Sequence, residues 1–326
     1  MQMLDKRARA LHIKPTPENP GTKHLVKYEW ANCRYAAAMR PGYEHFEIPE
    51  NSDERELVPD DVFCLTDVAS WRCRIWRLLD DLVTEKVKQS FRRNPPEYVV
   101  SDDLSWLNGI VLERTGREID MKSILAERIA QEYRSFRAGH GTRTNNLGQF
   151  YKDGIRYLRP HEIEASARAL FLTSDFDWVT EEKLQIAIAD IDARNTSGGR
   201  AGRLYFCADE RSLITRLGGA GHYLVYGSEY LSCLGVRLIG SLDTKNVLKS
   251  VGRPTMFVCD IPMKMMREHA LGEFAGMVLE ILFCELIGEP SDALSPGAGT
   301  ALSLTEDLPG VHIVGHYHPA AIHDPL

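Results

Sequence analysis

The spacing of apolar residues predicts a largely helical region in the first third of the chain. Apolar residues recur at helical intervals in the segment WRCRIWRLLDDLVTEKVKQSFRR, at Ile75, Leu78, Leu79, Leu82 and Val83. We expect one helix there, capped by Asp67 or Ser70 and ended by Pro95-Pro96. A shorter element from Asp103 to Leu112 and a capped helix from Ser123 to Tyr133 complete this region.

Beyond residue 130 the pattern changes to short apolar runs. Four strand-like runs, SFRAG, RLYFC, PTMFVC and VHIVG, alternate with helical stretches expected at 161–172, 180–193, 228–239 and 263–287. This alternation predicts an α+β fold. The second half of the stretch 263–287 is apolar on most faces, so we expect it to lie in the core rather than at a partner surface.

Two segments lack any apolar periodicity. Residues 1 to about 60 are rich in Pro, Glu, Asn and Asp and predict an extended or loop-rich lead-in, and SDALSPGAGTALS at 291–303 predicts a loop before the last strand. We therefore expect a mainly helical N-terminal region over residues 1–122 and a second domain over residues 123–326.

Composition and charge narrow the possible partners. The chain has 326 residues, 44% of them apolar and 26% charged, which suffices for a buried core. Its net charge of −7 gives no general attraction to nucleic acid, so such a partner would need a local basic patch. The basic run from Lys86 to Arg93 is better explained as a solvated helix face. No membrane-spanning stretch or signal peptide is apparent, and we expect a cytoplasmic protein without a membrane partner.

The sequence gives no support for several common kinds of functional site. The seven cysteines are scattered and never form C-x-x-C pairs, so we expect reduced, mostly buried thiols. No G-x-G-x-x-G after a strand, P-loop, H-E-x-x-H or G-x-S-x-G motif occurs. His316 and His318 would share one face of a strand, a spacing that suits zinc with a third ligand. Because no paired cysteine or acid accompanies them, we expect packing or acceptor-site roles and no metal.

Three polar clusters adjoin the predicted strands: HGTRTNN at 140–146, LYFCADE at 204–210 and GHYLVYGSEYL at 221–231. The first cluster opens a frame of His140-Gly141-Thr142-Arg143, then Asn146, Gly148 and Gly154-Ile155. This frame resembles the ADP-ribosyltransferase superfamily, in particular the diphtheria-toxin-like (His-Tyr-Glu) branch with the poly(ADP-ribose) polymerases and the rifampin ADP-ribosyltransferases. In that branch, His-Gly-Thr or His-Gly-Ser on the first strand leads through a helix to Gly-Leu or Gly-Ile. The resemblance covers about residues 130–326.

The resemblance implies a split β-sandwich with flanking helices and an enzyme that uses NAD as co-substrate. Such a glycosyltransferase cleaves NAD and transfers ADP-ribose to a macromolecular acceptor, protein or nucleic acid, and a bacterial toxin or defence role would fit. His140 would bond a ribose hydroxyl, and the backbone of Gly141 would hold the nicotinamide amide. A glycine permits close backbone approach, and an imidazole can donate to a hydroxyl without adding fixed charge. Tyr205 would stack on the nicotinamide, with Tyr223 and Tyr226 as competitors for that position.

Two residues are candidates for the acid position of this family. Glu229 follows Ser228 at a predicted helix start, where the pair could act only as a cap, but a carboxylate there could also stabilise an oxocarbenium-like state. The family's C-terminal acid has no counterpart in VHIVGHYHPAAIH, where His316 stands near its place. The candidates for catalysis are His140, Tyr205, Glu229 and His316. The candidates for NAD binding are His140, Gly141, Thr142, Arg143, Asn146, Tyr205, Tyr226 and Ser228.

Two other functions remain open at this point. The same fold could bind NAD or ADP-ribose without consuming it, because the C-terminal acid is missing. Alternatively, the C-terminal histidines could serve a metal-dependent nucleic-acid enzyme. The N-terminal region could recognise a substrate or dock a partner, such as an antidote or regulatory protein.

Overall fold

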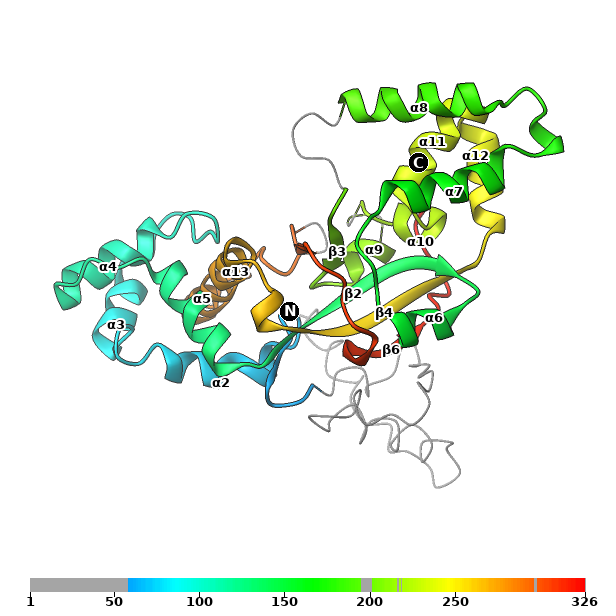
Figure 1. Ribbon diagram of the computed structural model, residues 1–326. Coiled ribbons are helices and arrows are strands. Elements are labelled where there is room, and N and C mark those ends of the chain that lie inside the picture. Colours follow the sequence, from blue (N-terminus) through cyan, green and yellow to red (C-terminus); the bar gives the residue numbers. More distant parts are fainter. Residues whose placement is uncertain (1–57, 195–200, 216, 218, 296–297, 326) are drawn as a thin grey trace, which may run out of the picture.

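The computed structural model describes residues 58–194, 201–215, 217, 219–295 and 298–325, and in them the chain folds around one open sheet (Figure 1). The strand order is β5-β3-β2-β4-β6, and β1 pairs in parallel with β2, whereas the other neighbours are antiparallel. The strands are β1 (Val62–Phe63), β2 (Ser135–Thr144), β3 (Leu204–Cys207), β4 (Arg253–Pro262), β5 (Ala301–Leu304) and β6 (Ile313–Tyr317). The α+β expectation and all four predicted strand runs are confirmed.

The long antiparallel pair of β2 and β4 forms the centre of the sheet. Their register runs from Ser135 opposite Pro262 to Thr144 opposite Arg253, so alternate side chains define two faces. One face carries His140 and is covered in part by α6 (Leu147–Asp153), whose Phe150 stacks on Phe257; we call it the α6 face. The other carries Gly141 and is covered by α10 (His222–Tyr226); we call it the α10 face.

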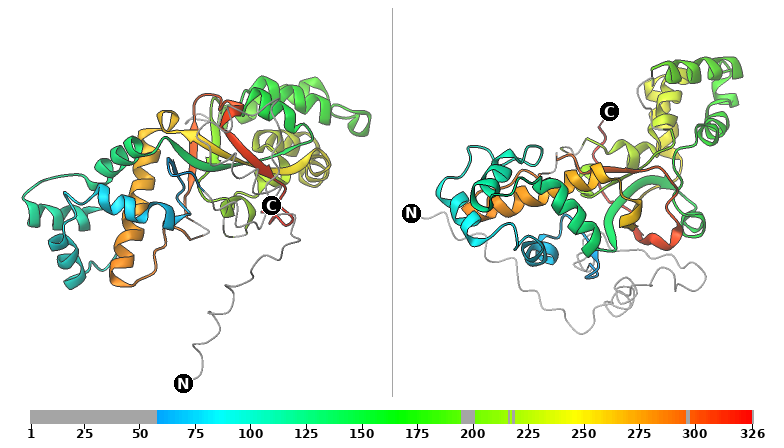
Figure 2. Two further views of the ribbon diagram at one scale, coloured as in Figure 1. Left: turned by 90° about the horizontal axis from the view of Figure 1, so that it is seen from below. Right: turned by 60° about the vertical axis from the view of Figure 1, so that its left-hand side comes forward.

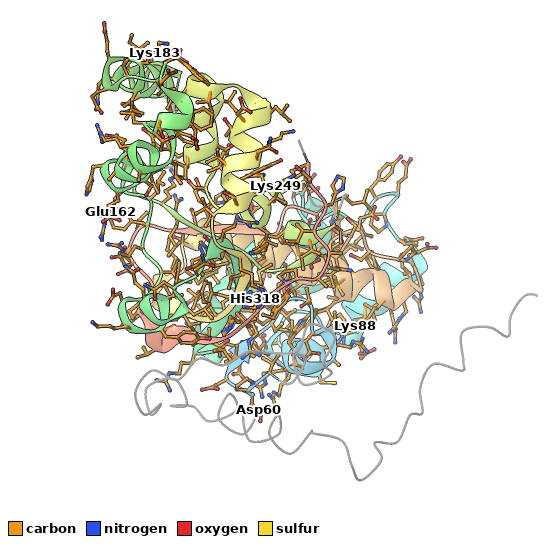
Figure 3. All side chains as sticks on the ribbon, turned by 90° about the vertical axis from the view of Figure 1, so that its right-hand side faces the viewer. Asp60, Lys88, Glu162, Lys183, Lys249 and His318 are labelled. Carbon is orange, nitrogen blue, oxygen red and sulfur yellow. The ribbon has the colours of Figure 1, made fainter. Side chains whose placement is uncertain are left out.

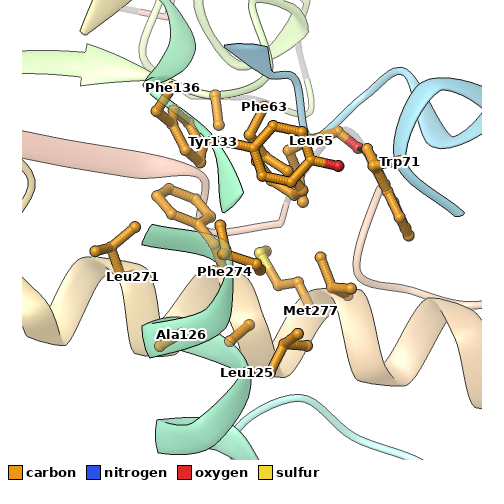
Figure 4. Packing of buried hydrophobic residues seen from close by; sticks show 14 of the residues in the cluster. Phe63, Leu65, Trp71, Leu125, Ala126, Tyr133, Phe136, Leu271, Phe274 and Met277 are labelled. Atoms are coloured by element: carbon orange, nitrogen blue, oxygen red, sulfur yellow. Dashed lines mark hydrogen bonds between the residues drawn. The ribbon is translucent and has the colours of Figure 1, made fainter. Parts of the chain in front are cut away.

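The N-terminal helices and α13 pack together beside the sheet (Figures 1 and 2). They are α2 (Val68–Leu78), α3 (Glu85–Arg93), α4 (Ser105–Thr115), α5 (Met121–Glu132) and α13 (Glu268–Ile287). Figure 4 shows the junction with the sheet, where the rings of Phe136 and Phe274 lie 4.6 Å apart. The core position expected for the apolar helix is confirmed. The expected boundary after residue 122 falls inside α5, and one buried cluster extends from Phe63 to Ile313.

The single helix expected after Ser70 is wrong, because the chain breaks between α2 and α3. Asp67 caps α2 as predicted, accepting a hydrogen bond from the Ser70 N–H. The break is held by Arg128 of α5, which donates to both oxygens of Asp81 and to the carbonyl of Leu78. The apolar residues of the break, Leu79, Leu82 and Val83, are buried. A tertiary ion pair and burial therefore override the local helical periodicity.

A second helical group follows β2 in the chain and has its own buried cluster (Figures 1 and 3). Its main helices are α7 (Pro160–Phe171), α8 (Glu181–Arg194), α11 (Glu229–Ile239) and α12 (Ser241–Ser250), and Figure 3 labels Glu162 and Lys183 on it. We call it the helical insertion. α9 (Arg211–Ile214) and α10 lie between it and the sheet.

The remaining differences from the sequence analysis are local. Helix α12 was not predicted, and β5 lies partly in the segment expected to be a loop, because Leu302 and Leu304 are buried and pair with β3. Residues 263–265 form a short 3₁₀ turn before α13. Most of the expected lead-in over residues 1 to about 60 lies outside the described residues. In the described part of the chain, no helix combines the length and apolar character that crossing a bilayer requires.

The shared core predicts the effect of one large-to-small substitution. Phe283 of α13 is fully buried, and its ring contacts those of Phe91 at 4.8 Å and Trp106 at 5.2 Å. We expect Phe283→Ala to lower the free energy of unfolding by about 3–5 kcal/mol, measured by urea denaturation. Leu242→Ala, at a side chain 73% exposed, is the control and should change it by less than about 0.5 kcal/mol. If Phe283→Ala and Leu242→Ala lowered the free energy of unfolding equally, the buried packing of Phe283 would be contradicted.

Candidate functional site

The first two polar clusters meet where β2 and β3 stop pairing. Gly139 opposite Cys207 is the one register pair between these strands in the described residues. The Ala208 N–H bonds Thr300 on the β5 side, so the peptide groups of Cys207 and Tyr205 face β2. The same register would place Gly141 opposite Tyr205, but the ladder does not extend to that pair. The peptide N–H and C=O of Gly141 therefore face β3 just beyond the end of the ladder, a position that we call the gap.

The imidazole of His140 takes part in this interruption. Its Nδ1 lies 2.9 Å from the carbonyl oxygen of Tyr205, and because a carbonyl only accepts, Nδ1 carries the proton. Burial lowers the pKa of His140, with the carbonyl opposing that shift, so the ring is neutral at pH 7. Its Nε2 is then an acceptor. A ribose hydroxyl would donate to His140, which reverses the direction expected from the sequence.

Gly141 is buried on the α10 face, where the third cluster covers it. A Cβ at this position would lie 3.1 Å from Leu224 of α10 and 3.2 Å from Leu213 of α9. A larger residue would require the side chains of Leu224 and Leu213 to shift by a few tenths of an ångström. Glycine thus fits the close packing of α9 and α10 on this face, and its peptide group faces β3 in the gap.

Tyr205 lies on the α10 face of β3 and is half-buried. It stands opposite Ser303 of β5. Because Leu204, Phe206 and Ala208 direct their peptide groups to β5, Tyr205 and Ser303 form a non-hydrogen-bonded pair, whose side chains approach most closely. Tyr205 therefore lies beside the gap at Gly141.

The guanidinium of Arg143 is fully engaged in hydrogen bonds within the protein. Nε donates to Val251, Nη1 to Leu224 and Val225, and Nη2 to Lys249 and Gly252, all through backbone carbonyls. These bonds use the five N–H groups that an arginine possesses. Arg143 therefore fastens the end of β2 to α10 and to the C-terminal end of α12. We treat it as a positioning residue rather than an NAD contact.

Three other candidates for NAD binding also have structural partners. The Asn146 side chain caps α6 by accepting from the Gln149 N–H, and the Ser228 hydroxyl caps α11 by accepting from the Leu231 N–H. The Tyr226 hydroxyl donates to Asp324 at 2.7 Å. Thr142 is half-buried on the α6 face beside His140 and opposite Thr255. Of these four, Thr142 lies on the same strand and face as His140.

Glu229 is the first residue of α11 and points back to α10. Its Oε2 lies 3.3 Å from the Tyr223 hydroxyl and 3.3 Å from Nε2 of His222. Its side chain is 35% exposed, and desolvation raises the pKa of Glu229. The carboxylate is thus held beside the helix that covers Gly141, at a helix N-terminus that favours its charge.

His316 lies on the α6 face, apart from Tyr205. It stands opposite Phe257, which in turn stands opposite His140, so two strand spacings of about 4.8 Å each separate the two histidines. His316 is buried, with Nδ1 2.9 Å from the Tyr151 hydroxyl. The shared face of His316 and His318 is confirmed by a ring separation of 5.4 Å. Among the described residues, no group of three His, Cys, Asp or Glu side chains is arranged to hold a metal ion.

The structure adds an acid that the sequence analysis did not assign. Glu210 follows β3, and its Cγ lies 2.9 Å from where a Cβ on Gly139 would stand, so it covers Gly139 on the α10 face. The Tyr317 hydroxyl donates to its Oε2 at 2.6 Å. Glu210 closes the cluster LYFCADE, and the one signal for it was an acid directly after a predicted strand.

Comparison of the chain with family models, with curated proteins and with solved structures gives no match in any of the three. The site must therefore be interpreted from its own geometry. That geometry brings His140, Gly141 and Tyr205 together at the end of the β2–β3 ladder. Glu210 and Glu229 border the α10 face, whereas His316 lies elsewhere.

The role of Arg143 can be tested by a substitution that keeps its charge. A lysine cannot reproduce the five-donor fork, so backbone carbonyls of α10 and α12 would lose their partner. We expect Arg143→Lys to lower the free energy of unfolding by at least about 2 kcal/mol. Arg253→Lys, at an exposed arginine of β4, is the matched control and should have no measurable effect. If both variants have the same free energy of unfolding as the wild type, the guanidinium of Arg143 does not hold the helical insertion to the sheet.

Burial of His140 also predicts a pH dependence of stability. Between the lowered pKa of the folded protein and the usual value of 6.5, the unfolded chain binds more protons. Stability therefore rises with pH through this window and falls as pH drops below about 6.5. We expect His140→Gln to lose less stability than the wild type between pH 7.5 and 5.5 in urea denaturation.

The pKa of His312 is lowered by burial as well, but His312 is present in both proteins, so the difference between them reports His140. An identical pH dependence in both proteins would mean that His140 is protonated equally in the folded and unfolded chains.

Proposed function

We propose that this protein is an NAD-dependent ADP-ribosyltransferase with an α+β fold related to the split β-sandwich of that superfamily. The observation that carries the proposal is the interrupted ladder at Gly141 and Tyr205. A strand-edge glycine offers an N–H and a C=O side by side, which match the C=O and N–H of a carboxamide. The resemblance assigns this pairing to nicotinamide, with Tyr205 as the ring that stacks on it.

The neighbouring groups suit the cleavage of a nicotinamide–ribose bond. Neutral His140 would accept from a ribose hydroxyl through Nε2 and orient the sugar. Loss of nicotinamide leaves an oxocarbenium-like ribose, which a nearby carboxylate stabilises. We propose Glu229, from the third cluster, as this carboxylate. Glu210 is a second candidate for the same role. An acceptor nucleophile then attacks the anomeric carbon and completes the transfer of ADP-ribose.

The acceptor class is a protein or a nucleic acid, and both fit a cytoplasmic toxin or defence effector. The helical N-terminal region, which shares its core with the sheet, offers a surface for an acceptor or an antidote protein. A module that binds NAD without consuming it is the alternative, because neither acid occupies the family's usual C-terminal position. A metal-dependent nucleic-acid enzyme has less support, because Nδ1 of His316 is within hydrogen-bonding distance of the Tyr151 hydroxyl, and Nδ1 of His318 bonds the carbonyl of Pro254.

The test is to incubate the purified protein with adenylate-labelled NAD and with protein, DNA and RNA acceptors. Nicotinamide release and label transfer are measured for the wild type, His140→Ala and His269→Ala. His269 is 82% exposed on α13 and serves as the matched control. We expect His140→Ala to reduce nicotinamide release at least about 100-fold, as for loss of a positioned polar group, and His269→Ala to leave it unchanged.

The same assay separates the alternatives. NAD binding without nicotinamide release, with every acceptor, would favour the non-catalytic module. Release that continues unchanged in His140→Ala would contradict the proposed site. Glu229→Gln and Glu210→Gln, compared at equal NAD concentration, identify which acid lowers the barrier.

A further inference from the structure

Arg203 is a half-buried arginine whose side chain has no hydrogen bond or ion pair in the described part of the chain. Other arginines nearby are paired: Arg159 with Asp307 at 2.7 Å, and Arg211 with Asp209 at 2.6 Å. A partly desolvated guanidinium without an anion is unfavourable. A ligand anion bound to Arg203 would offset that cost.

The position of Arg203 relative to Tyr205 gives the ligand a chemistry. Arg203 directly precedes β3, two residues before Tyr205. If the alternation of the strand continues to Arg203, the two side chains leave the same face about 7 Å apart. Ser303 stands opposite Tyr205 on β5, and its hydroxyl also has no partner in the described residues. The α10 face therefore presents an aromatic ring, a hydroxyl and a free guanidinium in sequence.

The backbone holds this arginine in place. The carbonyl of Arg203 accepts from the Leu158 N–H at 3.1 Å, and the Gly202 N–H donates to the Leu158 carbonyl at 2.9 Å. These two bonds fix the start of β3 before any ligand binds. The side chain is thus presented from a fixed backbone, which lowers the entropy that ligand binding would cost.

We propose that Arg203, assisted by the Ser303 hydroxyl, binds the pyrophosphate of a dinucleotide whose planar base lies against Tyr205. Guanidinium groups bind phosphate oxygens through two parallel charge-assisted hydrogen bonds. One ribose separates the base from the pyrophosphate, and this matches the step from Tyr205 to Arg203. The inference rests on the proposed function for the identity of the base, but the anion subsite stands on Arg203 and Ser303 alone.

The test measures the binding of three probes, NAD, ADP-ribose and nicotinamide, by isothermal titration calorimetry. Proteins compared are the full-length wild type, Arg203→Ala, Arg203→Lys and Arg253→Ala. Arg253 is the control, since it is exposed, without a partner in the described residues, and on the α6 face. We expect Arg203→Ala to weaken NAD and ADP-ribose about 10- to 100-fold, for the loss of a charge-assisted hydrogen-bond pair. The affinity for nicotinamide should stay unchanged. The affinity of Arg203→Lys for NAD and ADP-ribose should lie between those of the wild type and Arg203→Ala.

The outcomes separate the two proposals. If the wild type binds NAD and Arg203→Ala binds it equally well, the subsite is wrong and the NAD proposal stands. If ADP-ribose binds through Arg203 but the wild type releases no nicotinamide from NAD, the subsite is supported and the NAD-cleaving function is contradicted. If Arg253→Ala weakens binding as much as Arg203→Ala, the effect is one of general charge and the subsite is overturned. Failure of the wild type to bind any probe contradicts both.

Discussion

The arrangement of the site depends on the guanidinium of Arg143. The helical insertion has its own buried core and needs a defined connection to the sheet. Arg143 supplies it by bonding carbonyls of α10 and of the segment from Lys249 to Gly252. Carbonyls near helix C-termini lack helical partners, and the helix dipole favours a cation there. One side chain of β2 therefore fixes both α10 and α12, and with them Leu224 above Gly141 and Glu229 beside α10.

A second constraint follows at the same strand. With α10 seated on Gly141, a side chain at that position would crowd Leu224 and Leu213, and the glycine directs its peptide group towards β3. The ladder between β2 and β3 nevertheless stops one pair earlier, and there the imidazole of His140 binds the carbonyl of Tyr205. The glycine that α10 covers and the histidine that bonds β3 are thus adjacent in sequence, within the segment His140 to Arg143.

The four strands could be predicted from the sequence because their apolar runs are short, contain residues that favour strands and are flanked by turn residues. The sequence prediction failed where tertiary contacts determine the secondary structure. The break in the helix at Leu79–Thr84 depends on Arg128, which is 47 residues from its partner Asp81. Strand β5 forms by pairing with β3, which is distant in sequence. In the site, the adjacent residues His140 and Gly141 were found through their motif. The structural uses of Asn146, Ser228 and Tyr226, and the positions of Arg203 and Glu210, depend on partners distant in sequence, which no local pattern reveals.

The two faces of the sheet decide which acid can serve the proposed reaction. His316 shares the α6 face with His140, but Phe257 stands between them in register, so it cannot reach a sugar bound beside Tyr205 without moving Phe257. Tyr205 and Glu210 belong to the α10 face, and Glu229 is attached to α10 through Tyr223. A dinucleotide lying along β3 on the α10 face would lie on the side of the sheet that carries these two carboxylates. His140 would then contact it through the gap between the strands, from the edge where the ladder ends.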